Sequence, residues 1–217
     1  MLETLETETG PNPSASVIWL HGLGADGNDF APIVPELRLP ARAIRFVFPN
    51  APQIPVTING GMVMPAWYDI SDVAVRREDE RGVRASQAAI EALIEREIKR
   101  GSPAGNIVLA GFSQGGAIAL QTALRHPERI AGVMALSTYL PLADLLPAEA
   151  SAANCDVPIF MAHGTADPVI ALSRAEQSRD QLKSLGYRIE WHAYPMPHSV
   201  CPQEIADIGT WLQRVLG

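Results

Sequence analysis

Short apolar runs alternate with helical patterns along most of the chain. The runs contain few polar positions, as strands require when both faces of a parallel sheet are covered. They are Val17–Leu20, Ile44–Phe48, Ile107–Ala110, Ile130–Leu136, Val157–Ala162 and Arg188–Ala193. This alternation predicts an α/β fold with a mostly parallel central sheet and helices on both faces.

Four stretches have helical character. Apolar residues recur every three or four positions in residues 82–100 and 203–216, which predicts one core-facing stripe on each helix. Residues 117–125 and 169–185 are helical by composition, and Gly186 follows the second as a C-terminal cap would.

Two segments depart from this alternation. We expect residues 1–13 to be a flexible N-terminal segment. Residues 50–72 are rich in Pro, Gly and Met, so we expect a long loop that passes over the sheet edge near the active site. The chain has no internal repeat and no Gly/Ser-rich linker, which predicts a single domain over residues 1–217.

Composition narrows the class of protein. The 217 residues are 47% hydrophobic and 19% charged, as in a globular protein that needs no disulfide or metal to hold its core. A net charge of −7 argues against nucleic acid and anionic lipid as partners. The chain shows neither a secretory signal nor a spanning apolar segment, and Cys155 and Cys201 read as reduced thiols. We therefore expect a cytoplasmic protein without stable membrane insertion.

The most informative motif is Gly-x-Ser-x-Gly, which occurs at Gly111-Phe112-Ser113-Gln114-Gly115. An apolar strand precedes it and a helical stretch follows it. This context is that of a nucleophile elbow, a strained turn that projects the serine hydroxyl above the sheet. Residues without a Cβ are needed where strand and helix crowd together. The motif therefore predicts Ser113 as a nucleophile.

A serine nucleophile needs a base and an orienting acid, which in this fold follow it in the order Ser, Asp, His. Asp167 lies just past the predicted strand 157–162, and His198 lies past the strand 188–193. The other histidines have structural explanations: a helix-dipole interaction for His126, a structural hydrogen bond for His163 and packing in a strand for His192. Ser113, Asp167 and His198 are thus the predicted triad.

The glycine-dense loop after the first predicted strand predicts an oxyanion hole. Its glycines match neither a P-loop nor a dinucleotide-binding motif, so we assign the amide of Leu23, together with that of Gln114, to the oxyanion. No metal-ligand spacing occurs in the sequence. Neither Cys155 nor Cys201 lies in an elbow, which argues against a cysteine nucleophile.

Four separated segments resemble the carboxylesterase and acyl-protein thioesterase family of α/β hydrolases. They are His21–Gly27, Gly111–Gly116, His163–Val169 and Pro197–Val200, and the loop from Pro49 through Asn59–Gly61 to Trp67–Asp69 is similar to a loop of that family. The resemblance implies a small serine hydrolase with little or no cap domain and no cofactor. Carried over by position, it implies the same triad and oxyanion donors, and an acyl groove lined by Met62, Met64 and Trp67. Ordinary core packing is the alternative for each of these three.

Three functions are compatible with these residues. The first is a carboxylesterase that cleaves esters of short to medium acyl chains through an acyl-enzyme. The second is an acyl-protein thioesterase or lysophospholipase with the same triad, because no residue distinguishes oxygen from sulfur as the leaving atom. The third is a non-catalytic binding scaffold, which a complete triad disfavours. The expected partner is a small-molecule or lipid-like acyl substrate, and a homodimer is left open.

Overall fold

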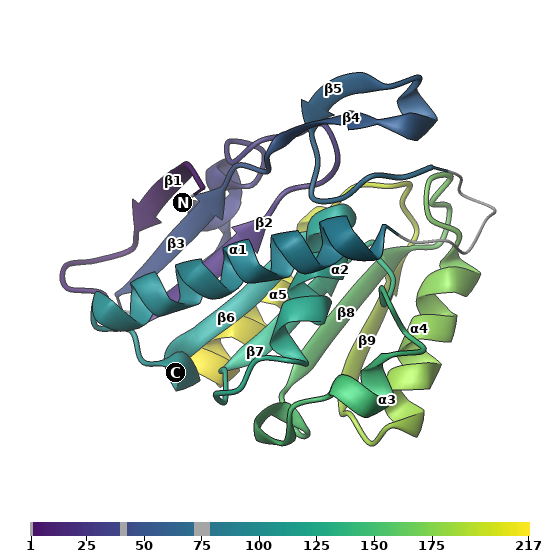
Figure 1. Cartoon of the computed structure of the whole chain (residues 1–217). Coiled ribbons are helices and arrows are strands. Elements are labelled where there is room, and N and C mark those ends of the chain that lie inside the picture. The colour runs from purple at the N-terminus through teal and green to yellow at the C-terminus, as the bar shows by residue number, and fades with distance from the viewer. Residues whose placement is uncertain (1, 40–42, 72–78) are drawn as a thin grey trace.

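A seven-stranded sheet runs through the centre of the molecule in the computed structural model (Figure 1). The structure describes residues 2–39, 43–71 and 79–217. The strand order is β1-β3-β2-β6-β7-β8-β9, and every neighbouring pair is parallel except β1 and β3. The predicted mostly parallel sheet is therefore confirmed.

The observed elements agree closely with the predicted ones. The strands are β2 (Ala15–Leu20), β3 (Ile44–Pro49), β6 (Ile107–Phe112), β7 (Gly132–Leu136), β8 (Ile159–Gly164) and β9 (Ile189–Tyr194). The main helices are α1 (Glu80–Lys99), α2 (Gln114–Ala123), α4 (Leu172–Ser184) and α5 (Pro202–Leu216). Short helical turns not predicted from the sequence are η1 (Ala31–Leu37), η3 (Ala104–Asn106), α3 (Leu146–Glu149) and η4 (Ala152–Asn154). In the described part of the chain, no helix has the length and apolar character needed to cross a membrane.

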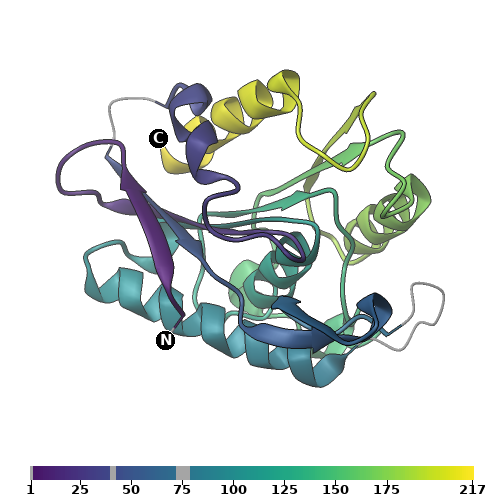
Figure 2. The same cartoon turned by 90° about the horizontal axis from the view of Figure 1, so that it is seen from above.

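Helices cover both faces of the sheet, as the view from above shows (Figure 2). Alternate residues of β2 point into two separate cores: Ile18 and Leu20 pack in the core under α1, α2 and α4, whereas Val17 and Trp19 pack in the core under η1 and α5. All four side chains are almost fully buried. Burial on both faces is the reason that the strands read as continuous apolar runs.

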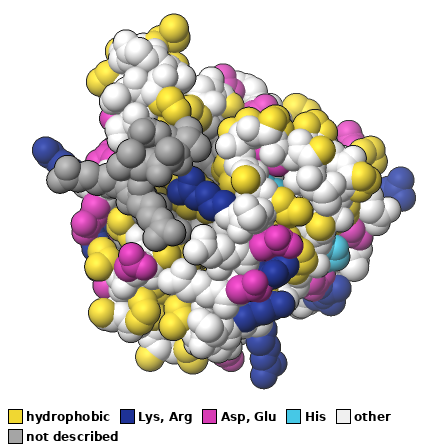
Figure 3. Space-filling view, turned by 90° about the vertical axis from the view of Figure 1, so that its right-hand side faces the viewer, with side chains coloured by type: hydrophobic (Ala, Val, Ile, Leu, Met, Phe, Trp, Pro, Cys, Tyr) yellow, Lys and Arg dark blue, Asp and Glu magenta, His cyan; other side chains and the backbone are white. Residues whose placement is uncertain are grey.

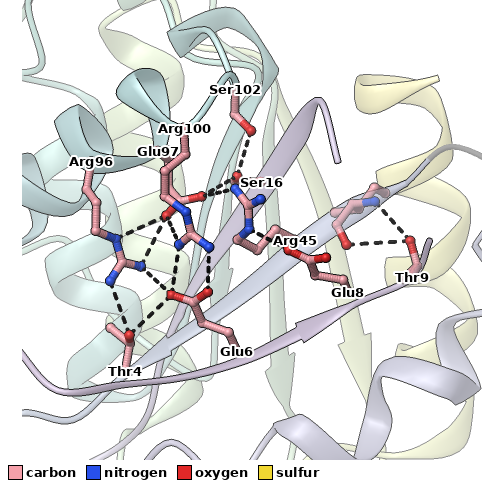
Figure 4. Close-up of polar contacts among 11 residues, drawn as sticks. Thr4, Glu6, Glu8, Thr9, Ser16, Arg45, Arg96, Glu97, Arg100 and Ser102 are labelled. Atoms are coloured by element: carbon pink, nitrogen blue, oxygen red, sulfur yellow. Dashed lines mark hydrogen bonds and ion pairs between the residues drawn. The ribbon is translucent and has the colours of Figure 1, made fainter. Parts of the chain in front are cut away.

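The N-terminal residues form a strand instead of the flexible segment that we expected. β1 (Thr4–Glu8) pairs antiparallel with β3 at one edge of the sheet. The strand is polar, so apolar periodicity does not reveal it. Its carboxylates instead join a network of charged and hydroxyl groups on β2, β3 and α1 (Figure 4).

Glu97 on α1 lies at the centre of this network, and its side chain is fully buried. Its Oε2 accepts from Arg45 Nη1 and from Ser16 Oγ, both at 2.9 Å. Its Oε1 accepts from Arg100 Nη1 at 3.0 Å. Glu6 of β1 then accepts from the second nitrogen of Arg100 at 2.9 Å. The network therefore ties the edge strand to the helix.

The loop expected over residues 50–72 contains a hairpin, and Asp72 lies outside the described residues. β4 (Gln53–Val56) and β5 (Met62–Pro65) pair antiparallel around η2 (Thr57–Asn59) and project beyond the main sheet (Figure 1). The prolines that argue against a helix are compatible with this two-stranded ribbon, because both of its strands are edges.

We expect Glu97→Ala to lower the free energy of unfolding by about 3 to 5 kcal/mol, because it removes the buried carboxylate that pairs with Arg45 and leaves only the half-exposed Glu8 as its partner. The Arg45 side chain is only 8% exposed. Urea unfolding followed by circular dichroism measures the effect. The matched control is Glu95→Ala on the same helix, whose side chain is 68% exposed and should cost less than about 1 kcal/mol. Equal losses in the two variants would contradict a central role for Glu97.

Candidate active site

The predicted catalytic residues lie beyond the carboxyl ends of four parallel strands. Leu23 follows β2, Ser113 follows β6, Asp167 follows β8 and His198 follows β9. Carboxyl ends of parallel strands meet at one edge of a sheet, which is the usual place for a ligand site in an α/β protein. The topology therefore brings together residues that are far apart in the sequence.

Ser113 occupies a strained turn between β6 and α2. Its backbone has φ 55° and ψ −122°, a conformation that residues with a side chain rarely adopt. Two contacts hold the turn: the Ser113 N–H donates to the Leu136 carbonyl at 2.9 Å, and Thr138 Oγ1 donates to the Ser113 carbonyl at 2.7 Å. This geometry confirms the predicted elbow.

Two glycines allow the elbow to pack closely. A Cβ on Gly111 would lie 2.2 Å from the Gly115 carbonyl carbon, and a Cβ on Gly115 would lie 2.3 Å from the Leu20 carbonyl oxygen. Both distances are far below van der Waals contact, so neither position tolerates a side chain without a backbone shift. A Cβ on Gly22 would lie 3.4 Å from the Ser113 Cβ, which places the predicted oxyanion loop directly beside the nucleophile.

Asp167 and His198 are hydrogen-bonded to each other. His198 Nδ1 lies 2.6 Å from Asp167 Oδ2, and Asp167 Oδ1 accepts from the backbone N–H groups of Val169 at 2.8 Å and Ile170 at 2.9 Å. Burial alone raises the pKa of Asp167, but the hydrogen bonds from His198, Ile170 and Val169 together lower it below its ordinary value. The ionised carboxylate only accepts, so Nδ1 of His198 donates and the neutral ring keeps a lone pair on Nε2.

The His198 ring lies against the elbow. The ring of Phe112, the residue before Ser113, is 4.7 Å from the His198 ring between centroids. The loop that carries His198 packs tightly on the end of β8, because a Cβ on Gly164 would lie 2.4 Å from the carbonyl oxygens of Met196 and Pro197. The structure thus places His198 and Asp167 close to the elbow that carries Ser113.

The remaining histidines take other places. His163 is buried, with Nε2 2.9 Å from the Ile170 carbonyl, so the expected structural hydrogen bond is confirmed. His192 stacks on Phe160 at 4.8 Å between centroids, which confirms packing in a strand. Burial lowers the pKa of His126, and nearby Glu91, Glu128 and Glu95 act in the opposite direction. The helix-dipole interaction expected for His126 stays a prediction.

The two proposed oxyanion donors are available at the site. Gln114 is the first residue of α2, so its N–H has no acceptor within the helix. Leu23 lies in the loop beside Ser113, and no described residue accepts its N–H. The described residues hold no cluster of three or more potential metal ligands. Both cysteines are free thiols in the structure.

The three residues predicted to line an acyl groove differ in exposure. Met62 on the projecting hairpin is 64% exposed, and hydrophobic side chains gather there (Figure 3). Met64 is half-buried, and its Sδ accepts from Asn59 Nδ2 at 3.2 Å. Trp67 is buried, and its indole N–H donates to the His21 carbonyl at 2.9 Å. Contact of any of the three with an acyl chain stays a prediction.

Glu204 is a buried carboxyl group close behind the His198 loop. It is the third residue of α5, whose first turn follows Cys201. Burial raises the pKa of Glu204 to about 8, the backbone N–H of Cys201 acts in the opposite direction, and Asp207 adds to the increase. The folded protein therefore keeps this carboxyl protonated at neutral pH. No sequence pattern indicated this group, because a glutamate in a first helical turn is usually exposed.

Comparisons with known proteins agree along the whole chain. A family model described as Phospholipase/Carboxylesterase matches residues 5–216. Acyl-protein thioesterase 1 of Neurospora crassa is 45% identical over 216 residues, covering 94% of this chain and 87% of the relative. The protein of the same name from Yarrowia lipolytica is 40% identical over 208 residues, covering 93% and 92%.

Solved structures extend this similarity to the fold. The crystal structure of Zea mays acyl-protein thioesterase 2 matches with a TM-score of 0.88 and 29% identity, and the match covers 100% of both chains. Arabidopsis thaliana SOBER1 matches with a TM-score of 0.86 and 30% identity, covering 94% of this chain and 99% of that one.

Glu204→Gln should stabilise the protein at alkaline pH. Between pH 4.5 and about 8 the folded state holds a proton that the unfolded state releases, so the contribution of Glu204 to stability falls as pH rises through this window. The variant lacks this titration. At about 1.4 kcal/mol per pKa unit, the increase from 4.5 to about 8 predicts that the free energy of unfolding of the variant exceeds that of the wild type by about 4 to 5 kcal/mol at alkaline pH.

Urea unfolding at pH 4.5 and at pH 8.5 measures this difference. The two proteins should have similar stability at the lower pH. The control is Glu176→Gln on α4, whose side chain is 43% exposed and should show no such dependence on pH. A stability difference between wild type and Glu204→Gln that stays constant with pH would disprove the assignment.

Proposed function

Because the chain belongs to the phospholipase/carboxylesterase family of α/β hydrolases, we propose that it is an acyl-protein thioesterase, a serine hydrolase that cleaves the thioester between a fatty acyl group and a protein cysteine. The observation that carries this proposal is the similarity over almost the whole chain to relatives named acyl-protein thioesterase 1, at 45% and 40% identity. These relatives favour the thioesterase over the carboxylesterase that we placed first from the sequence.

The site geometry supports a two-step acyl transfer. His198 Nε2 removes the Ser113 proton, and the Ser113 oxygen forms a bond to the acyl carbon. Asp167 holds the ring through its 2.6 Å hydrogen bond and stabilises the imidazolium. The carbonyl oxygen becomes an oxyanion, which accepts from the amides of Leu23 and Gln114. Each such donor contributes about 3 to 4 kcal/mol in the transition state.

Collapse of the tetrahedral intermediate breaks the bond between carbon and sulfur. The imidazolium of His198 gives its proton to the departing sulfur, and the thiol leaves. Water then attacks the Ser113 ester with His198 again as the base, and release of the carboxylic acid restores the enzyme. All of these steps use residues of the described site.

The hairpin supports an apolar acyl group as substrate. Residues 49–68 contain no charged side chain, and Ile58, Met62 and Val63 are largely exposed. Methionine adapts to apolar ligands of different shape because its side chain is unbranched and flexible. The hairpin is joined to the oxyanion loop, since the Gly24 N–H donates to the Pro65 carbonyl at 2.8 Å.

The second candidate is a carboxylesterase or lysophospholipase, which the description of the family model favours. The same triad cleaves oxygen esters through the same intermediate. The two candidates differ only in the leaving group, so a direct comparison of substrates separates them.

We expect the protein to have a higher kcat/KM on an S-palmitoyl cysteine peptide than on the matched O-palmitoyl serine peptide, because a thiol leaves more readily than an alcohol. Ser113→Ala should lower both rates by at least about 10⁴-fold. Ser151→Ala, at the N-cap residue that precedes η4 and away from the site, should keep full activity. A clear preference for the oxygen ester would support the carboxylesterase instead. A wild-type protein that is inactive on both peptides would contradict both candidate functions.

Asp167→Asn should lower kcat by about 10³- to 10⁴-fold, because an amide that donates to Nδ1 would place the histidine proton on Nε2, where the base needs its lone pair. Steady-state kinetics on a p-nitrophenyl ester measure the loss. The matched control is Asp156→Asn, whose side chain is 70% exposed and pairs with Arg129. It should change kcat by less than about twofold, since surface ion pairs contribute little. A wild-type rate in Asp167→Asn would exclude this acid.

A further inference from the structure

The side chain of Gln114 joins the nucleophile elbow to the segment that follows the hairpin. Its Oε1 accepts from the Trp67 backbone N–H at 3.1 Å, and its Nε2 donates to the Tyr68 carbonyl at 2.8 Å. Gln114 is only 3% exposed. Two opposite hydrogen bonds to consecutive residues fix the carboxamide in one orientation. The first residue of α2 is therefore held against residues 67 and 68.

The same segment holds the oxyanion loop from the other side. The Trp67 indole N–H donates to the His21 carbonyl at 2.9 Å, and the two rings lie 5.3 Å apart between centroids. The Gly24 N–H donates to the Pro65 carbonyl at 2.8 Å. Groups on both sides of Leu23 are thus bonded to residues 65–67.

His21 adds a third connection that requires its neutral ring. The Ala51 backbone N–H lies 3.0 Å from His21 Nε2, and a backbone N–H only donates, so Nε2 carries no proton. Nδ1 then carries the proton and donates to the Gly22 carbonyl at 2.7 Å. Burial lowers the pKa of His21, with the Gly22 carbonyl, Asp26 and Asp29 acting in the opposite direction, which agrees with a neutral ring.

The geometry points to the Gln114 carboxamide and the Trp67 indole as positioning groups that set the spacing between the two oxyanion amides. This inference rests on the proposed function. The two amides belong to separate elements, the loop after β2 and the N-terminus of α2. Residues 65–68 bond to both of these elements. The Gln114 side chain and the Trp67 indole therefore form a bridge from one donor to the other.

Spacing matters because the oxyanion exists only during the reaction. Its donors must lie about 2.7 to 3.1 Å from the oxygen, and a displacement of about 1 Å can lower the rate by about 10²-fold. The Gln114 amide that binds the oxyanion belongs to the backbone. A substitution of the Gln114 side chain therefore keeps the backbone N–H donor and removes only the hydrogen bonds that hold it against residues 67 and 68.

The test uses Gln114→Leu and Trp67→Phe, which remove the bridging groups and retain apolar volume. The readouts are kcat/KM on an acyl ester and the inhibition constant of a trifluoromethyl ketone that carries the same acyl chain, because its adduct with serine presents an oxyanion to the same amides. We expect kcat/KM to fall by about 10- to 100-fold and the inhibition constant to rise by the same factor. Inhibition by the fatty alcohol of the same chain length, which presents no anionic oxygen, should change by less than about twofold.

Two control variants remove the same chemical groups elsewhere in the core. Gln121→Leu lies on the same helix, where the buried amide donates to Gln87 at 2.9 Å and not to residues 65–68. Trp19→Phe removes a buried indole N–H that has no partner among the described residues. Both should keep kcat/KM and ketone affinity within about twofold of the wild type, even where they lower the melting temperature.

The outcomes separate this inference from the proposed function. If Gln114→Leu loses activity without a matching loss of ketone affinity, or if Gln121→Leu shows the same losses, the groups are merely structural and the inference fails. If Gln114→Leu and Trp67→Phe keep the wild-type kcat/KM and ketone inhibition constant, this inference fails while the proposed function stands. A folded wild type that cleaves neither esters nor thioesters would overturn the proposed function and this inference together.

Discussion

The close crossing of strand β6 with helix α2 is the constraint on which the candidate active site depends. Helix and strand approach so closely that Gly111 and Gly115 have no room for a Cβ, and the chain between them turns through a left-handed residue. Such a backbone costs about 1 to 3 kcal/mol and persists only where its surroundings hold it. Here the Leu136 carbonyl and the Thr138 hydroxyl do so. The crossing raises Ser113 toward the loops that carry the other residues of the site.

Charged side chains are distributed differently in the network at the β1 edge of the sheet and in the candidate active site. The edge strand β1 is held by buried and half-buried ion pairs around Glu97. The candidate site instead places neutral backbone amides beside Ser113, while the Trp67 indole and the Gln114 carboxamide donate to the carbonyls of His21 and Tyr68. Asp167 is its buried anion, and the hydrogen bonds it accepts compensate its loss of water. Neutral donors can stabilise a transient oxyanion without a permanent counter-ion in the site.

The identity of the leaving atom is not set by this geometry. Oxygen esters and thioesters give the same oxyanion on the same serine, so the triad and the amides serve both. The choice depends on what binds beyond the acyl carbon. The uncharged segment over residues 49–68, which we propose to bind the acyl group, connects to the loops or helices that carry both proposed oxyanion donors. Under this proposal, one stretch of chain would both bind substrate and align the donors.

The central strands, the long helices and the position of Ser113, Asp167 and His198 at one end of the sheet were all predictable from the sequence. Strands buried on both faces and amphipathic helices leave a local apolar pattern, and the elbow needs small residues at fixed spacing. The order of Asp167 and His198 follows because each comes after a strand. β1 was missed because it is polar and stabilised by partners on other elements. The hairpin was read as a loop because its prolines and glycines mask its pairing.

Only the tertiary structure showed what the Gln114 side chain, Trp67 and His21 do. The hydrogen bonds that join them to other segments connect residues 30 to 47 positions apart, and no local pattern records a contact at such separation. From the sequence we therefore predicted that Trp67 lines the acyl groove, whereas in the structure its indole N–H donates to the His21 carbonyl in the predicted oxyanion loop. The burial of Glu204 was also not predictable from the local sequence, because the residues that shield its side chain from water are brought there only by folding. The sequence determined which groups are candidates for the chemistry, and the fold decided how those groups are held.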